Sequence, residues 1–237
     1  MCGKFTAMAS WREVVDFSQP LTTERGVEDR VVTYRPMAMV PVIVFDHETG
    51  TRHVVPMRWG FPHPKNFRIP QPIHARADSI DTTRAFCDAF SGGQRGIVVM
   101  QTFNEGKELS PTKTEQWTVN PGDGVPRGFA FLWRRFEVAD LPVPMLACVM
   151  VTVPANNLIR DAIMEGVTDP RMPAILGDAD WPTWLGETDV PPDQVKATLR
   201  TMGGVNWRID PEPKSQKEKR AKQAKPTKKP PVEPSLF

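Results

Sequence analysis

Short apolar runs separated by Gly, Pro and Asp dominate the middle of the chain. Five runs rich in β-branched or aromatic residues predict strands, namely 40–45 (VPVIVF), 52–57 (RHVVPM), 96–102 (GIVVMQT), 129–133 (FAFLW) and 147–153 (ACVMVTV). The first two flank the turn-forming sequence His47-Glu48-Thr49-Gly50, which predicts a hairpin.

Helical patterns are fewer and shorter. We expect helices over four segments, 10–17, 82–90, 155–165 and 191–202. The first has Ser10 as N-cap with Glu13 three residues later, a capping box, and the last has Gly203 just past its end. Strands interleaved irregularly with short helices, without a repeating strand–helix–strand rhythm, predict an α+β fold around a mostly antiparallel, curled sheet.

Composition divides the chain into a domain over 1–210 and a tail over 211–237. The whole chain has 237 residues, 40% of them hydrophobic, which is enough for one substantial core. The tail is rich in Lys and Pro and carries a net charge of +5, which leaves −3 on residues 1–210 because the chain totals +2. The tail is predicted to be disordered, and it acts either as a solubilising segment or as an arm that attracts phosphate.

Several classes of protein are disfavoured. No run approaches the roughly 18 apolar residues of a membrane span, and the N-terminus lacks a signal-peptide pattern, so we expect a monomeric cytoplasmic protein. Three widely spaced cysteines fit a reducing compartment. The four histidines are scattered and no Cys or His cluster has metal-ligand spacing, so we expect neither a metal nor a cofactor.

Cys2 is the most informative single residue. Once Met1 is removed, Cys2 carries a free amine and a thiol, and such a 1,2-aminothiol condenses with an aldehyde to give a thiazolidine ring. The α-amino group suits this role because its pKa is about 7.7–8.0, against roughly 10.4 for a lysine, so far more of it is neutral at pH 7. The alternative is that Cys2 is an incidental residue beside the start codon.

Four segments, in this order, resemble one protein family. Residues 1–5 (MCGKF) are similar to its MCGRF start, and 58–62 (RWGFP) to its W-G-L/F-x-P loop. Residues 75–78 (ARAD) resemble its N-A-R-A-E motif, and 171–176 (RMPAIL) with Trp184-Leu185 resemble its H-x-R-M-P-x-I-L…W-L close. This is the SOS-response-associated peptidase (SRAP) family, and the resemblance covers roughly residues 1–210.

The resemblance implies both a fold and an activity. Its members are abasic-site processing proteins with a β-barrel-like core and a basic groove for DNA. They trap the open-chain aldehyde of an abasic site, preferentially in single-stranded DNA, as a thiazolidine on the terminal cysteine. The expected setting is the DNA damage response of a bacterial or phage-host cell, close to the nucleoid.

The resemblance also assigns candidate catalytic residues. Glu105 stands where the family carries a glutamate that moves protons, and partial burial would raise the pKa of its carboxyl towards a useful range; the alternative is a surface glutamate in a polar loop. His74 replaces the family's Asn, and Asp169 replaces its usual His. One hypothesis is that His74 moves protons with Asp169 orienting it; the alternative is a structural histidine and a capping aspartate.

Candidate DNA contacts come from the same motifs. Arg76 is expected to grip a phosphate, with a salt bridge to Asp78 as the alternative. Lys4 keeps the positive charge of the family's start-motif Arg. Arg171 of the R-M-P motif and His74, from the motif around Arg76, are also assigned to DNA. Trp59 and Phe61 either wedge between bases or belong to the core.

Other functions compete with this interpretation. They are a glutaminase-type amidotransferase with Cys2 as nucleophile, a peptidase that cleaves the Met1–Cys2 bond in cis, and a non-covalent binder of single-stranded DNA. The terminal Leu236-Phe237 resembles the end of sliding-clamp binding peptides, but the Gln of such peptides is missing and a chance apolar end is the favoured interpretation.

Overall fold

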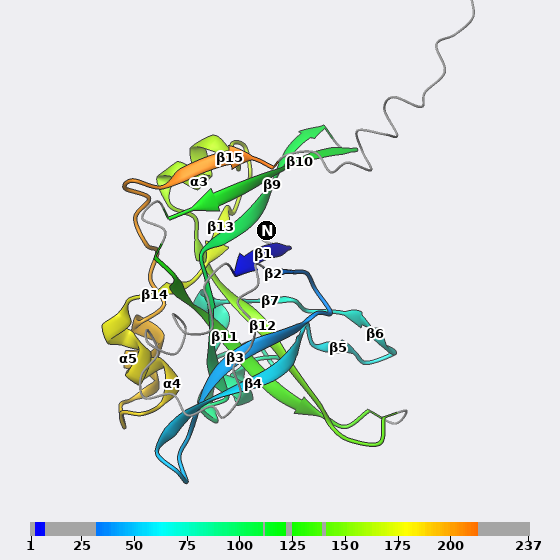
Figure 1. The fold of residues 1–237 in the computed structure, drawn as a ribbon, viewed down its shortest axis with the longest axis vertical. Helices are drawn as coiled ribbons and strands as arrows, with labels where there is room; N and C mark the ends of the chain where they lie inside the picture. The colour runs from blue at the N-terminus through cyan, green and yellow to red at the C-terminus, as the bar shows by residue number, and fades with distance from the viewer. Residues whose placement is uncertain (1–2, 8–31, 111, 122–124, 139–140, 213–237) are drawn as a thin grey trace, which may run out of the picture.

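The computed structural model describes residues 3–7, 32–110, 112–121, 125–138 and 141–212. The helix expected over 10–17, the tail from residue 213 onward and its terminal Leu236-Phe237 lie outside the described residues. The described part is a mixed α+β structure built mainly of antiparallel strands, as the sequence predicts (Figure 1).

A closed ring of five strands forms the centre of the molecule. Its members are β3 (Met39–Asp46), β4 (Thr51–Trp59), β8 (Arg95–Met100), β11 (Arg127–Phe136) and β12 (Met145–Pro154). They pair in the order β12-β4-β3-β8-β11, and β11 pairs again with β12, which closes the barrel. Only the β12–β4 pairing is parallel among these five.

All five predicted strands lie on this barrel, and the β3–β4 hairpin is confirmed. Its turn is closed by a hydrogen bond of 2.8 Å from the Gly50 N–H to the Asp46 carbonyl. Gly50 has a φ of 67°, a left-handed conformation that glycine adopts at little cost.

Three short strands extend the barrel sheet at its edges. They are β7 (His74–Arg76), which runs parallel to β12, β13 (Arg171–Pro173), which pairs antiparallel with β12, and β14 (Ile175–Leu176), which pairs with β11. β7 and β13 therefore meet on the same end of β12, and this pairing brings together two motifs that are far apart in sequence.

A second sheet covers the barrel and carries the N-terminal strand. Its order is β15 (Arg208–Pro211), β10 (Lys113–Asn120), β9 (Thr102–Ser110), β1 (Lys4–Ala7) and β2 (Val32–Tyr34). Most of β9 and all of β10 were not predicted, because their polar residues alternate without long apolar runs. β15 continues one residue past the boundary drawn at 210.

The described helices are short. They are α2 (Cys87–Ser91), α3 (Asn157–Ala162), α4 (Trp181–Leu185) and α5 (Pro192–Ala197), with 3-10 turns η1 (Ala77–Ser79) and η2 (Asp178–Asp180). The predicted helices at 155–165 and 191–202 are present but shorter. The one at 82–90 was wrong in its first half, where the chain forms turns closed by bonds to the Ser79 and Thr83 carbonyls.

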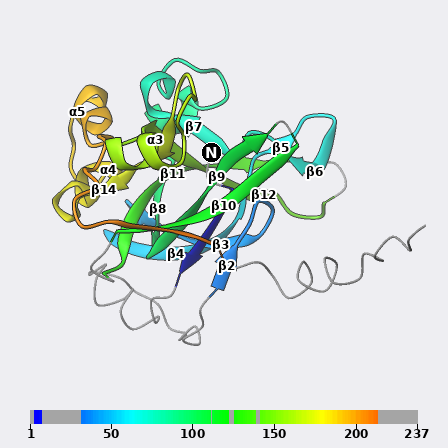
Figure 2. The same cartoon turned by 90° about the horizontal axis from the view of Figure 1, so that it is seen from above.

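Helices α4 and α5 lie on one side of the barrel, and the hairpin of β5 (Pro62–His63) and β6 (Asn66–Pro70) lies on the other (Figures 1 and 2). Trp184 of α4 is fully buried, whereas Trp133 is only partly buried. Within the described ranges, no helix has the length and apolar character needed to cross a membrane.

Candidate active site and nucleic-acid interface

The N-terminal strand is inserted next to the strand that carries Glu105. β1 pairs antiparallel with β9, with Lys4 opposite Asn104 and Phe5 opposite Phe103. The next step of this register is Gly3 and Glu105, and Gly3 is exposed. Cys2 itself lies outside the described residues, but the chain leading to it arrives beside Glu105.

Glu105 is fully buried in the second sheet. Its exposed fraction is 0%, and it is paired with Trp117 of β10 on the side away from β1. The neighbouring Asn104 is 2% exposed and donates a hydrogen bond of 2.9 Å from its Nδ2 to Thr118 Oγ1. The alternative of a surface glutamate in a polar loop is therefore excluded. A buried carboxyl held on a strand is better suited to proton transfer than a carboxyl exposed to solvent.

Trp59 connects the N-terminal strand to His74. Its ring centroid is 5.1 Å from that of Phe5 in β1 and 6.4 Å from that of His74 in β7. Its Nε1 donates a hydrogen bond of 3.1 Å to the Ile73 carbonyl, which fixes the residue just before His74. The structure thus brings Phe5 of β1 and His74 of β7 into contact with one indole ring.

Trp59 and Phe61 belong to the core. Their exposed fractions are 0% and 3%, and Phe61 packs edge-on against Phe136 with ring centroids 5.0 Å apart. In this conformation neither ring offers an open face on which a base can stack. The burial agrees with the core interpretation of this motif rather than with the base-wedging one.

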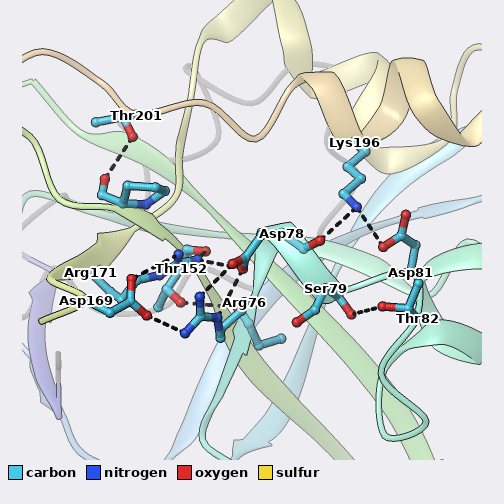
Figure 3. Close-up of polar contacts among 12 residues, drawn as sticks. Arg76, Asp78, Ser79, Asp81, Thr82, Thr152, Asp169, Arg171, Lys196 and Thr201 are labelled. Carbon is cyan, nitrogen blue, oxygen red and sulfur yellow. Dashed lines mark hydrogen bonds and ion pairs between the residues drawn. The ribbon is translucent and has the colours of Figure 1, made fainter.

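Arg76 lies in an exposed cluster of two arginines and two aspartates (Figure 3). Its Nε and Nη2 donate to the two carboxylate oxygens of Asp78, at 3.1 and 2.6 Å, and its Nη1 donates to Asp169. Arg171 donates from Nη2 to Asp78 at 3.1 Å and to the Thr152 carbonyl at 2.8 Å. Two positive and two negative charges make the cluster electrically neutral.

The members of this cluster differ in accessibility. The Arg76 side chain is 50% exposed and the Arg171 side chain only 5%, so Arg76 is the arginine that an incoming ligand meets. Hydrogen bonds from Arg76 lower the pKa of Asp78 to about 2, and the same bonds raise the pKa of Arg76. The ion pair between Arg76 and Asp78, the alternative considered from sequence, is present.

Asp169 contacts arginines rather than His74. Its carboxylate pairs with Arg76 and lies 3.8 Å from Arg171 Nη1. Among the described residues it makes no hydrogen bond to His74, so the geometry does not support the idea that Asp169 orients the His74 ring. His74 and Arg76 nevertheless share one face of β7, because they are two residues apart on a strand.

Lys4 of β1 forms an ion pair within the second sheet. Its ammonium group pairs with Glu212, directly after β15, and its side chain is 11% exposed. This contact joins the first described strand to the last.

Two features of the site were missed in sequence reasoning. The central role of Asp78, which joins both arginines, requires β7 and β13 to meet on β12. Lys196 of α5 reaches the same region, donating to the Asp78 carbonyl at 3.1 Å and to Asp81 Oδ1 at 2.7 Å. Within the part of the chain that the structure describes, no three His, Cys, Asp or Glu side chains are grouped so as to hold a metal ion.

Comparisons with known proteins agree with the family resemblance. The family model described as SOS response associated peptidase (SRAP) matches residues 1–212. The chain is 24% identical over 204 residues to the abasic site processing protein YoqW of Bacillus subtilis, covering 84% of this chain and 87% of that protein. It is 25% identical over 203 residues to the abasic site processing protein YobE of the same organism, covering 84% and 88%.

Solved structures share the fold. A protein from Bordetella bronchiseptica superposes with a TM-score of 0.72 at 19% identity, covering 90% of this chain and 100% of that one. A protein from Bacteroides thetaiotaomicron gives a TM-score of 0.67 at 16% identity, covering 89% and 91%. At these identities the likeness concerns the fold alone.

Proposed function

Because the chain belongs to the SOS response associated peptidase (SRAP) family, we propose that it processes abasic sites in DNA and that Cys2 does so by covalent capture. Two relatives that match most of the chain carry the name abasic site processing protein, which supports the broader part of this proposal. The covalent step rests on the chemistry of Cys2 and on the position of Glu105.

The proposed reaction joins the aldehyde carbon of a ring-opened abasic sugar to both functional groups of Cys2. The free amine adds to the aldehyde and gives a carbinolamine, which loses water and becomes an imine. The thiolate then adds to the imine carbon, the nitrogen takes up a proton, and a five-membered thiazolidine results. One water molecule leaves, and no oxidant or reductant is needed.

Glu105 is the group proposed to move protons in this sequence. Sugar-ring opening and loss of water from the carbinolamine each need a proton donor and an acceptor close to the reacting carbon. The observation that carries the proposal is the register of β1 on β9, which brings the chain that ends in Cys2 to the fully buried Glu105.

His74 is proposed as a second proton-transfer group. It lies on β7, where it contacts the Trp59 ring that also packs against Phe5, and an imidazole titrates near neutral pH. It occupies the position of the family's Asn, and the contacts of Asp169 leave it to act without that carboxylate. Arg76, on the same face of β7, is the proposed contact for a phosphate of the DNA strand.

The experiment is incubation with a single-stranded oligonucleotide that carries one abasic site, followed by denaturing electrophoresis. We expect a heat-stable adduct with the wild-type protein and with Cys87→Ala, a control that removes a thiol from α2, and none with Cys2→Ala. A native gel shift without any adduct would contradict covalent capture and favour a non-covalent DNA binder. An adduct that persists in Cys2→Ala would assign the chemistry to another group.

A further inference from the structure

Each of the three nitrogens of the Arg76 guanidinium donates a hydrogen bond to one of the protein's own carboxylates. The edge formed by Nε and Nη2 faces Asp78 in a two-bond fork, and Nη1 faces Asp169 (Figure 3). A DNA phosphate recognises the same donors, since an arginine fork matches the oxygens of carboxylate and phosphate alike. A phosphate that forms such a fork with Arg76 therefore competes with these carboxylates for its donors.

The two carboxylates are held very differently. Asp78 accepts two bonds from Arg76 and a third, of 3.1 Å, from the buried Arg171, and it lies in the η1 turn directly after β7. Asp169 contacts Arg76 through Nη1 alone, and its other cationic neighbour, Arg171 Nη1, is 3.8 Å away. The Asp169 side chain is 47% exposed, so its contact with Arg76 is screened by water.

We propose that Asp78 orients Arg76, whereas Asp169 is a built-in competitor that occupies the place of a DNA phosphate on Arg76 until DNA displaces it. This inference rests on the proposed function in one respect, that DNA is the ligand. The competition makes Asp169 a determinant of affinity: the protein binds undamaged strands weakly, because an incoming phosphate competes with the Asp169 carboxylate for Arg76.

The exchange also has an electrostatic consequence. The cluster of Arg76, Asp78, Asp169 and Arg171 carries no net charge while Asp169 is docked, and the folded part of the chain is slightly acidic. Removing the Asp169 charge leaves one uncompensated positive charge at the exposed Arg76. Such a charge strengthens binding to a phosphate and releases a further counterion when it does so.

The test compares the binding of an undamaged, fluorescently labelled single-stranded oligonucleotide by wild type, Asp169→Asn and Glu137→Gln over a series of salt concentrations. Glu137→Gln also removes one negative charge from an exposed carboxylate–arginine pair, with Arg135 at 3.4 Å. Glu137 follows Phe136, which is opposite Met145, whereas Arg76 is level with Thr152; at about 3.3 Å per residue these ends of β12 are roughly 23 Å apart.

We expect Asp169→Asn to bind roughly three- to tenfold more tightly at low salt, and its plot of log K against log salt to be steeper by about 0.7. Glu137→Gln should change affinity less than about twofold, with the same salt slope as wild type. In the double variant Arg76→Ala, Asp169→Asn, the gain should disappear. A thermal melt of each variant checks that the fold is intact, and Asp169→Ser provides a second removal of the charge.

The inference is overturned if folded Asp169→Asn and Asp169→Ser bind no more tightly than wild type, or if the gain survives in the double variant. Absence of DNA binding by wild type and variants alike would overturn it as well. Failure of covalent capture is a separate outcome, because it is read from adducts on abasic DNA while this test uses undamaged strands.

Discussion

Replacement of Trp59 by leucine separates a core role from base stacking. The change removes the hydrogen bond to the Ile73 carbonyl, worth about 1 kcal/mol, and that carbonyl keeps a second bond of 3.1 Å from the Met150 N–H. Lost ring contacts with Phe5 and His74 and the volume that leucine does not refill cost roughly 2 kcal/mol more.

The total loss of about 3 kcal/mol corresponds to a fall in Tm of roughly 6–12 °C for a domain of this size. Urea unfolding and thermal melts measure it. Trp184→Leu is the matched control, because Trp184 is also fully buried and donates a hydrogen bond of 2.9 Å to the Gly96 carbonyl. Both variants should lose similar stability, but only Trp59→Leu should slow adduct formation, since only Trp59 contacts Phe5 and His74.

The affinity of Trp59→Leu for undamaged single-stranded DNA distinguishes a core role of Trp59 from a base-stacking role. If Trp59 is a core residue, its replacement by leucine leaves this affinity within about twofold at a temperature where the protein is folded. A stacked base is worth about 1–3 kcal/mol, so a stacking role would lower affinity at least fivefold. A fivefold loss of affinity with a fall in stability below about 1 kcal/mol would refute the assignment of Trp59 to the core.

Three further predictions concern single residues. Glu105→Gln should lower the rate of adduct formation at least about 100-fold, while affinity for undamaged DNA stays unchanged; an equal loss of both would point to a structural role. Arg76 depresses the pKa of Asp78 to about 2. The ionised Asp78 carboxylate therefore stabilises the fold, by about 1 kcal/mol because the side chain is half exposed and screened by water. This contribution is present above about pH 4, the ordinary pKa of an aspartate, and is lost as pH falls towards 2. Urea unfolding at pH 2–6 should show less acid destabilisation in Asp78→Asn than in wild type, and parallel curves would argue against the pair. Gly128→Ala should destabilise the fold by about 1–3 kcal/mol, because its Cβ would lie 2.3 Å from the buried Trp181 ring; unchanged urea unfolding would mean that the ring moves aside.

The barrel strands were predictable because each carries its own signal. The run at 40–45 and the run at 52–57 are apolar and β-branched, and the turn residues between them set the hairpin. The strands of the second sheet carry no such signal. β10 alternates polar residues with Trp117 and Val119, a pattern that β-branched and aromatic enrichment would have identified as a strand with one face buried.

The proposed chemistry of Cys2 and the motif position of Glu105 come from the sequence, whereas the complete burial of Glu105 could not be predicted from it. That burial arises because β1 and β10 flank β9. β10 follows β9 directly in the sequence, but β1 lies about 100 residues before β9, and such a distant pairing leaves no local trace. The partners of Asp169 were also hidden: sequence suggested His74, but β13 meets β12 beside β7 and turns Asp169 towards Arg76 and Arg171.

The most direct test of the account is mass spectrometry of the N-terminal peptide, before and after reaction with single-stranded abasic DNA. We predict that this peptide begins at Cys2 and lacks Met1. On reaction its mass should increase by the mass of the sugar remnant minus one water, with the remnant bonded to both the amine and the sulfur of Cys2. An unmodified N-terminal peptide beside an adduct on a lysine, or retention of Met1 in protein that still forms the adduct, would contradict thiazolidine capture by Cys2.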